Sequence, residues 1–437
     1  MSGLLNVLAL IGIPLLTLAG TPLFTMLALI ALVAFHSSGV NSAAVVIEMG
    51  RLTSSPMLVA IPLFTFAGFL FAEAGTPQRL VRLTRALVGW IPGGVAVVAM
   101  VACAVFTAFT GASGVTIIAL GGLLMPALLR ERFSERFSLG LLTTGGSLGI
   151  LFPPSLALII YSYVATQTAG LGALDPRQGP TLDRLFVAGI LPGVLLIVLL
   201  TIYAQYRMRR DGAGTTARFN ARELAGAVRE ARWEIPLPFL LVGAIYGGRL
   251  TVTEAAAATA FYALVVEVFL YRDIPLKRLP AVASEGMVLV GGILILLASA
   301  LGLTNYLVDA EVPMKALAAI EGLITNRFIF LFALNIFLLI IGSVTEVFGA
   351  LIVVLPLIIP IAQRYGVDLT HLGIIFLANL EIGFMLPPLG LNLFISAFRF
   401  RQPILRVYGA TLPFLLVLAV GLLLITYIPA LSLVLLN

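Results

Sequence analysis

Two short stretches decide the fold: GGSLGILFPPS at Gly145–Ser155 and NLEIGFMLPPLGLN at Asn379–Asn392. Both lie inside long apolar runs where a helix should continue. Two adjacent prolines remove two backbone donors, and the residue before each proline is pushed out of the α region, so neither stretch can be one unbroken helix. In lipid, free backbone groups are tolerated only against protein or in a wet cavity. We therefore predict two broken membrane helices, non-helical at Gly149–Phe152 and Gly383–Leu386.

The two stretches are in register with each other. The residue pairs separated by 234 positions are Gly149 and Gly383, Pro153 and Pro387, Pro154 and Pro388, and, upstream of each break, Pro126 and Pro360. One break alone could be a proline kink without a function, which is common in membrane helices. Two interrupted spans at matching places in two halves indicate an internal repeat and point to the binding site of a transporter.

The composition is that of a polytopic helical membrane protein. The 437 residues are 60% hydrophobic and 11% charged, with a mean hydropathy of +1.12, and apolar runs of about 20 residues are enough to span a bilayer. The pI of about 9.7 does not indicate nucleic-acid binding, because 24 of the 26 basic residues are arginines, mostly in short loops between spans. The single cysteine, Cys103, excludes an internal disulfide, and no Walker motif for ATP is present.

Two re-entrant hairpins are predicted, each directly before a broken span. The first is Gly94–Leu129 with its tip at Thr110–Gly114, and the second is Phe328–Ile361 with its tip at Gly342–Val347. The amphipathic segment Gln78–Val88 is typical of a helix on the membrane surface. The other expected elements are Leu4–Leu18 and Pro22–Phe35, which form either one kinked helix or two short ones, an interfacial segment at Asn41–Thr53, the broken spans Phe137–Thr166 and Leu372–Phe398, and spans at Pro56–Ala72, Leu185–Tyr206, Ile235–Tyr246, Glu254–Leu270, Gly286–Leu303 and Ile404–Ile428.

The distribution of positive charge orients the chain. With these spans, 19 basic residues fall on one side of the membrane, seven of them in the polar segment Arg207–Arg232, and seven fall on the other side. The richer side is expected in the cytoplasm, which puts the C-terminus in the periplasm. The ends of the first hairpin then lie inside and those of the second outside. The sequence thus predicts an inverted repeat, as alternating access favours.

Oxygen atoms gather at the tips and breaks, as a small hard cation such as Na⁺ requires. Unwound glycines release carbonyls, and half-helix C-terminal ends carry partial negative charge. The sodium-binding candidates are Gly111, Ser113, Gly146, Ser147, Gly149, Gly342, Thr345, Glu346, Asn379 and Gly383. A half-helix N-terminus suits a carboxylate, and the substrate-binding candidates are Ser113, Pro154, Ser155, Pro388 and Asn392. The two histidines are isolated at span ends, so no transition-metal site is expected.

Two acids lie at membrane depth, Glu346 at the second tip and Glu381 in the second break. Such groups are costly and usually mark ion or substrate pathways. The alternative is a glutamate satisfied by backbone donors at the end of a broken helix, and the sequence leaves both possibilities open for each acid. Glu73 and Glu267 lie near span ends and can reach the interface, so we interpret them as structural.

Over nearly its whole length the chain resembles the large membrane subunit of TRAP transporters, the DctM-type family. The stretches that carry the resemblance are Thr110–Gly114 through Pro126, Gly145–Ser155, Leu185–Gly193, Thr253–Ala257 and Glu381–Asn392. Val252 differs from the family, which often has proline before Thr-Glu-Ala-Ala. Ala112 and Gly114 stand where many relatives carry serines, which leaves the side-chain ligands of the first ion site open.

The resemblance implies an importer with two partners: a small four-helix membrane subunit of the DctQ type and a periplasmic substrate-binding protein of the DctP type. The substrate is usually an organic acid such as a dicarboxylate or sialic acid, and transport is typically Na⁺-driven, without ATP or another cofactor. The expected location is the bacterial inner membrane. Because this chain starts directly with the large-subunit pattern, we expect the small subunit to be a separate chain.

The resemblance also implies an all-α, elevator-type architecture, similar to that of the ion transporter superfamily. The hairpins and broken helices would move against a scaffold of the other spans. The expected domains are N-terminal scaffold helices with an interfacial arm at 1–92, a first transport repeat at 93–166, scaffold helices with a cytoplasmic loop (207–232) at 167–303, a second transport repeat at 304–398 and a C-terminal span at 399–437.

Two other functions fit parts of the pattern. A stand-alone Na⁺-coupled carboxylate transporter or ion antiporter of the same architecture would work without a periplasmic protein. A membrane enzyme could use Glu346 and Glu381 as an acid/base pair, but no metal ligands or nucleophile motif accompany these two carboxylates. We therefore expect no enzymatic activity.

Overall fold

The architecture is all-helical in the described part of the chain. A computed structural model describes residues 21–436 except 39–42, 44–45, 48–49, 51–55, 92, 170–178, 212–218, 312–314, 316–323 and 325. Within these residues six helices are long and apolar enough to cross a membrane, and two bent pairs of helices pass the same test. A polytopic helical membrane protein, as predicted from the sequence, is confirmed.

The first hairpin and the first broken helix follow one another along the chain. α6 (Gly94–Thr110) and α7 (Ser113–Arg130) are the two arms, and the turn between them uses Gly111 at a φ of +66°. α8 (Glu135–Gly145) and α9 (Leu156–Ala169) are the two halves of the broken helix. The amide of Phe137 donates to Ser134 Oγ at 3.2 Å, so a polar cap fixes where α8 begins.

The second hairpin and broken helix repeat this arrangement. α17 (Arg327–Val344) is one arm, α18 (Val347–Val353) with α19 (Leu355–Arg364) is the other, and α20 (Leu369–Gly383) with α21 (Leu391–Phe400) is the broken helix. Adding 234 to the bounds of α7 gives the start of α18 and the end of α19, and adding it to the start of α8 gives the start of α20. The order of the helices along the chain is therefore the same in both halves, with two arms followed by two half-helices.

The two breaks lie where the prolines predict them. The first is non-helical from Gly146 to Ser155, a range that includes the predicted Gly149–Phe152 and extends three residues beyond it on each side. The second begins at Phe384, one residue later than predicted, because the amide of Phe384 still donates to the Leu380 carbonyl at 3.0 Å and keeps Gly383 in the helix. Both Pro–Pro peptide bonds are cis.

Glycines let each break approach the adjacent hairpin arm. A Cβ added at Gly149 would lie 2.3 Å from the Ala104 carbonyl oxygen in α6, and one added at Gly383 would lie 2.6 Å from the Cα of Gly342 in α17. Both contacts are with backbone atoms, which cannot move aside as a flexible side chain can. Each broken helix is therefore pressed against its own hairpin at a position where only glycine fits.

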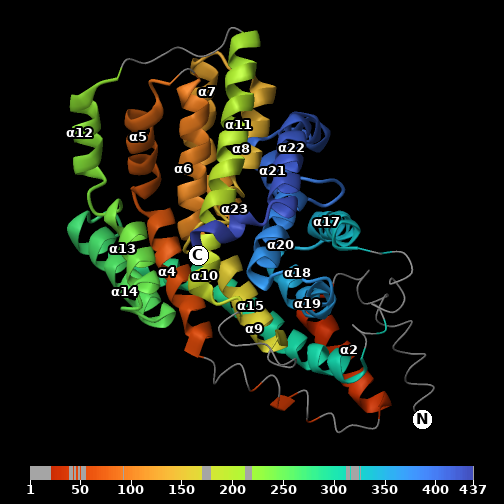
Figure 1. Ribbon diagram of the computed structural model, residues 1–437. Helices are drawn as coiled ribbons and strands as arrows, with labels where there is room; N and C mark the ends of the chain where they lie inside the picture. The colour runs from red at the N-terminus through yellow and green to blue at the C-terminus, as the bar shows by residue number, and fades with distance from the viewer. Residues whose placement is uncertain are drawn as a thin grey trace.

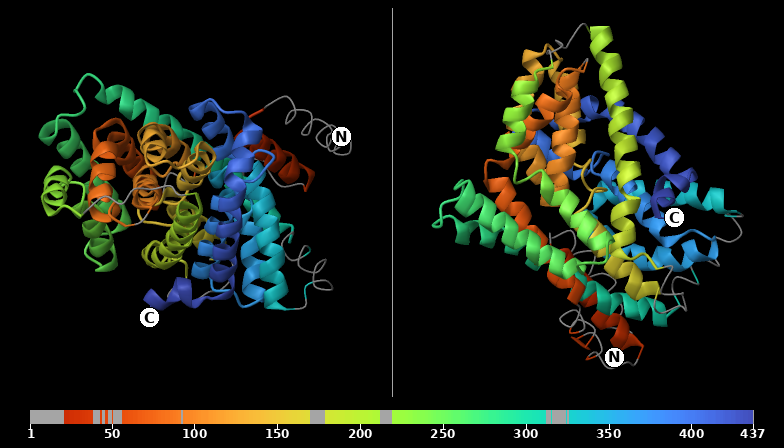
Figure 2. Two further views of the ribbon diagram at one scale, coloured as in Figure 1. Left: turned by 90° about the horizontal axis from the view of Figure 1, so that it is seen from above. Right: turned by 60° about the vertical axis from the view of Figure 1, so that its left-hand side comes forward.

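The remaining helices pack around these two units. Figure 1 shows α6, α7, α8 and α11 side by side, and both views of Figure 2 place α12–α14 on one side of the molecule and α17–α22 on the other. The long α15 packs against α2 and α4. These helices are α2 (Leu23–Ser37), α4 (Ala60–Glu73), α5 (Thr76–Val88), α10 (Leu182–Ala188), α11 (Ile190–Asp211), α12 (Ala221–Glu230), α13 (Pro236–Tyr246), α14 (Val252–Leu264) with a π-helical continuation at Val265–Leu270, α15 (Leu279–Asp309), α22 (Ile404–Tyr427) and α23 (Ala430–Leu433).

The N-terminal predictions are covered only in part. α2 corresponds to the expected segment Pro22–Phe35, whereas Leu4–Leu18 and most of Asn41–Thr53 lie outside the described residues. The predicted polar segment Arg207–Arg232 contains helix at both ends, since α11 continues to Asp211 and α12 covers Ala221–Glu230.

α12 is held against the predicted surface helix α5. Asn220 caps α12, and Arg82 of α5 pairs with Glu223, at 2.8 Å, and with Glu230. The Arg82 guanidinium holds the pKa of the Glu223 carboxyl below its usual value. These groups are exposed, so the ion pairs orient the two helices and add little to stability.

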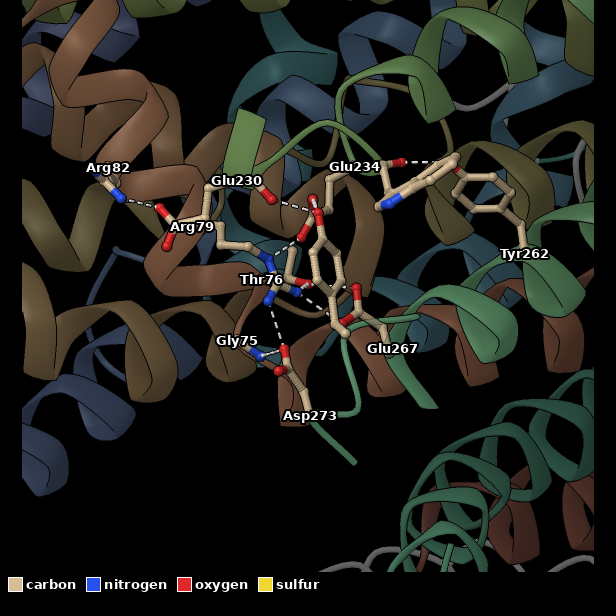
Figure 3. Close-up of polar contacts among 11 residues, drawn as sticks. Gly75, Thr76, Arg79, Arg82, Glu230, Glu234, Tyr262, Glu267 and Asp273 are labelled. Carbon is tan, nitrogen blue, oxygen red and sulfur yellow. Dashed lines mark hydrogen bonds and ion pairs between the residues drawn. The ribbon is translucent and has the colours of Figure 1, made fainter. Parts of the chain in front are cut away.

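A buried ion cluster fixes the other end of α5 (Figure 3). The Arg79 guanidinium pairs with Glu234, with Glu267 at 2.8 Å and with Asp273 at 2.6 Å. Its Cζ also lies 3.8 Å from the centre of the Tyr271 ring. Arg79, Glu234 and Glu267 are 8%, 3% and 0% exposed. The cluster therefore ties α5 to the segment before α13 and to the segment that ends α14.

The prediction that Glu267 reaches the membrane interface is wrong. We expected it to reach the interface, but it is fully buried and accepts hydrogen bonds from Arg79 and, at 3.0 Å, from Thr76 Oγ1. The reason is that Arg79 lies on the buried face of the amphipathic α5, where sequence periodicity alone does not reveal its partner. Glu73, by contrast, is exposed and pairs with Arg278 at 2.9 Å.

We expect Arg79→Gln to lower the free energy of unfolding by about 3–5 kcal/mol, because it leaves the carboxylates of Glu234 and Glu267 buried without their cation. The exposed Arg82→Gln is the matched control and should cost less than about 1 kcal/mol. Thermal unfolding of the purified variants in detergent compares them. Equal melting temperatures for the two variants would contradict the role given to the cluster.

We expect Gly383→Ala to destabilise the protein by about 1–3 kcal/mol, because its methyl group would overlap the backbone of Gly342. Gly291→Ala is the matched control: α15 leaves open space around that position, and alanine is the better helix former by about 1 kcal/mol. The same thermal unfolding assay checks both. A Gly383→Ala variant as stable as the Gly291→Ala control would show that the close approach is not required.

Candidate functional site

The first tip lies between the second halves of both broken helices. A Cβ at Gly111 would lie 2.7 Å from Leu156 Cδ1, so the turn rests on the first residue of α9. Ser113 Oγ donates to Asn392 Oδ1 at 2.8 Å, which places the start of α7 against the start of α21. The structure thus brings together two residues that the sequence predicted as substrate-binding candidates, although 279 positions separate them.

Buried polar groups extend this contact. Asn392 Nδ2 lies 3.5 Å from the Thr143 carbonyl oxygen, and Thr143 Oγ1 donates to Ser396 Oγ at 2.9 Å. Thr143, Asn392 and Ser396 are fully buried. The half-helices α8 and α21, which belong to different repeats, are therefore joined by side-chain hydrogen bonds in addition to apolar packing.

Oxygen atoms of the first hairpin meet the first break at Gly146. Thr107 Oγ1 donates to the Gly146 carbonyl at 2.9 Å and lies 2.7 Å from Thr116 Oγ1. A Cβ at Gly146 would lie 3.2 Å from the Ser113 carbonyl oxygen. Such a set of hydroxyl and carbonyl oxygens is the donor type that a small hard cation takes. Sequence reasoning missed Thr107 and Thr116; their signal is a pair of hydroxyls flanking the tip in otherwise apolar arms.

The second tip is tied to the second break. The amide of Leu389 donates to the Ser343 carbonyl at 3.2 Å, and Thr345 Oγ1 donates to the Ile341 carbonyl at 2.9 Å. Glu346 accepts a hydrogen bond from the Gly349 amide at 3.1 Å and caps α18. The backbone hydrogen bond that the sequence left open for Glu346 is therefore present. That Glu346 also binds an ion stays a prediction.

Asn379 belongs to a hydrogen-bond network that does not include Ser113 or Asn392. Its amide nitrogen donates to Asn335 Oδ1 at 2.7 Å, and Asn335 in turn donates to Thr426 Oγ1 at 3.1 Å. This network connects α20 to α17 and α22. Asn335 was not among the predicted site residues; its only signal in the sequence is an amide in the middle of an apolar arm.

The first break meets the last turn of α20 at Ser147 and Glu381, which are themselves 234 positions apart. Ser147 Oγ lies 3.3 Å from the Thr144 carbonyl oxygen and 3.5 Å from the Glu381 carbonyl oxygen. Both residues are fully buried. In the described part of the chain neither carboxylate oxygen of Glu381 has a hydrogen-bond partner.

The remaining substrate-binding candidates differ in their access to the outside. Pro154 and Ser155 are buried at the start of α9, whereas Pro388 is exposed. The Pro388 carbonyl accepts a hydrogen bond from the Tyr408 hydroxyl at 3.0 Å. The first break is therefore enclosed, and the second is open at its prolines. Among the described residues no group of three His, Cys, Asp or Glu side chains could hold a metal ion.

Residues 9–431 match the family described as the tripartite ATP-independent periplasmic transporter, DctM component. The chain belongs to this family. It is a large permease of a TRAP transporter and a multi-pass membrane protein.

Relatives of known name agree with this assignment. The C4-dicarboxylate TRAP transporter large permease protein DctM of Pseudomonas aeruginosa is 35% identical, over 92% of this chain and 91% of its own length. The ectoine/5-hydroxyectoine TRAP transporter large permease protein UehC of Ruegeria pomeroyi is 31% identical, over 83% and 81%. The isethionate TRAP transporter permease protein DctMQ of Oleidesulfovibrio alaskensis is 32% identical, over 85% and 57%.

A solved structure supports the fold. The Alcanivorax borkumensis YdaH transporter, whose crystal structure is described as having an unusual topology, superposes with a TM-score of 0.63 over 87% of this chain and 86% of its own. The two sequences are 15% identical. A likeness at this identity concerns the fold alone.

We expect the contact between Ser113 and Asn392 to show as an energetic coupling. In a double-mutant cycle with Ser113→Ala and Asn392→Ala, the lost hydrogen bond should give a coupling free energy of about 0.5–1.5 kcal/mol. The control cycle pairs Ser113→Ala with Thr259→Ala, whose hydroxyl bonds within α14, and should be additive. Unfolding measurements on the four proteins of each cycle test this; additivity in the first cycle would refute the contact.

Proposed function

We propose that this chain is the translocating subunit of a tripartite importer that takes up an organic acid, driven by a Na⁺ gradient. The observation that carries the proposal is the contact of Ser113 with Asn392, which joins the first hairpin tip to the second broken helix. A solute bound there would touch elements of both repeats at once. The names of the quoted relatives favour a small organic solute, and C4-dicarboxylates are our first candidates.

Na⁺ coupling is supported by the oxygens around the tips and breaks. Thr107, Thr116 and Gly146 supply two hydroxyls and a carbonyl in one buried cluster. The C-terminal ends of α8 and α20 add partial negative charge. No Lys, Arg or His side chain pairs with these groups among the described residues. Such a low-dielectric, oxygen-lined environment favours a small cation that has shed its water.

We further propose an elevator movement in which both hairpins and both broken helices move as one body. The hydrogen bonds of Asn392 and Thr143 tie the two repeats to each other and support their joint movement. The contacts of α22 with α8, and of Asn335 with Thr426, favour adding α22 to the moving body. The Arg79 cluster holds the arm α5 to the α12–α14 region, which suits a fixed scaffold.

The proposed system includes a small four-helix membrane subunit and a periplasmic substrate-binding protein, located at the bacterial inner membrane. Reconstitution into proteoliposomes with both partners tests the proposal. Uptake of a radiolabelled C4-dicarboxylate should require both partners and an inward Na⁺ gradient, and choline should not replace Na⁺. Uptake without the binding protein would instead favour the stand-alone transporter, and uptake that ignores Na⁺ would overturn the coupling.

We expect Glu346→Gln to raise the Na⁺ concentration for half-maximal uptake. Glutamine keeps an oxygen that can accept the hydrogen bond of the Gly349 amide, so the helix cap survives while the negative charge near the cation is lost. Glu254→Gln is the matched control, because Glu254 belongs to the capping box of α14 with Thr251. Uptake across a Na⁺ series, at matched expression, separates the two. If Glu346→Gln and the control share the wild-type Na⁺ dependence, Glu346 is only a cap.

A further inference from the structure

Glu381 is the one acid of the described transport region that is buried and accepts no hydrogen bond from the described residues. Its side chain is 0% exposed, and neither of its oxygens accepts a hydrogen bond in the described part of the protein. The acid at the second tip, Glu346, is exposed and accepts a hydrogen bond from a backbone amide. The two acids therefore differ in kind: one is a helix cap, and the other is buried without a donor.

Carbonyl and hydroxyl oxygens lie around the backbone of Glu381. Glu381 lies two residues before the C-terminal end of α20, where the last carbonyls carry partial negative charge. The segment that follows α8 approaches the backbone of Glu381, because Ser147 Oγ lies within hydrogen-bond distance of both the Thr144 and the Glu381 carbonyl oxygens. Thr144 Oγ1 is also buried and has no partner among the described residues.

An ionised carboxylate in such a place is strongly unfavourable unless a cation accompanies it. The partial negative charges of two helix C-termini destabilise an anion nearby and stabilise a cation. Hydroxyl, carbonyl and carboxylate oxygens together are the ligand set of a hard cation. The second repeat thus carries a carboxylate at the position where the first repeat has Ser147.

We infer that the Glu381 carboxylate is the charged ligand of a Na⁺ site between the two breaks, separate from the oxygens around Gly146 and from the second tip. The inference rests on the proposed Na⁺ coupling and adds to it a site with a formal negative charge. The bound Na⁺ neutralises Glu381, so the pair contributes no net charge when the moving body crosses the membrane. The protein with Glu381 therefore binds one Na⁺ more than it would bind through backbone and hydroxyl oxygens alone.

The test counts Na⁺ directly. Equilibrium binding of ²²Na⁺ to the full-length chain, purified with its small subunit, gives the number of ions bound at saturation. We expect Glu381→Gln to bind one Na⁺ fewer than the wild type. Glu381→Asp keeps the charge on a shorter side chain and should keep the count, with an affinity about tenfold weaker, or about 1.4 kcal/mol. Glu285→Gln, an exposed acid on α15, is the control and should match the wild type.

The outcomes separate this inference from the proposed function. If the wild type binds Na⁺ and Glu381→Gln binds the same number with the same affinity, the inference is overturned and the Na⁺ coupling stands. If the wild type binds no Na⁺, the coupling itself is wrong. If Glu381→Gln does not fold, Glu381→Asp decides: an unchanged affinity contradicts a ligand role, and a weaker affinity with an unchanged count supports it.

Discussion

The structure depends on one constraint: a backbone group freed inside a membrane protein must find its partner in the protein or in an enclosed cavity. The Pro–Pro pairs free such groups in both breaks, and the partners come from the hairpins and from the break itself. Thr107 reaches the Gly146 carbonyl, the Ser343 carbonyl accepts from the Leu389 amide, and the Phe384 carbonyl accepts from the Asn392 amide. The hairpins therefore complete the broken helices, and neither unit could be stable alone at this depth.

The same constraint accounts for where we propose that ions and the solute bind. Breaking a helix exposes carbonyl oxygens, ends a helix dipole and opens space for small polar side chains, and these are the features that bind ions and organic anions. Glycines bring each broken helix into backbone contact with its own hairpin. The hydrogen bond of Ser113 to Asn392 joins the first tip to the other repeat as well.

Local sequence predicted the elements well, because each has a local cause. The glycine-rich stretches with their Pro–Pro pairs separate α8 from α9 and α20 from α21, small polar residues mark both tips, and amphipathic spacing predicts α5. Long-range partners could not be predicted in this way. The residues next to Glu267 in the sequence do not indicate that it pairs with Arg79, and those next to Asn379 do not indicate its hydrogen bond with Asn335. The second break starts one residue late because a single hydrogen bond to the Leu380 carbonyl outweighs the freedom of Gly383. Pairings of this kind depend on packing across the repeats.

The central claim is that the tips and breaks form the ion-binding part of the protein. Hydrogen exchange followed by mass spectrometry, on the purified chain in Na⁺ and in choline, tests it most directly. The account predicts slower exchange in Na⁺ for peptides covering 107–116, 146–155, 342–349 and 384–392, with no change in 221–264, which contains α12–α14. Equal exchange in both salts at the tips and breaks, or protection confined to 221–264, would contradict it.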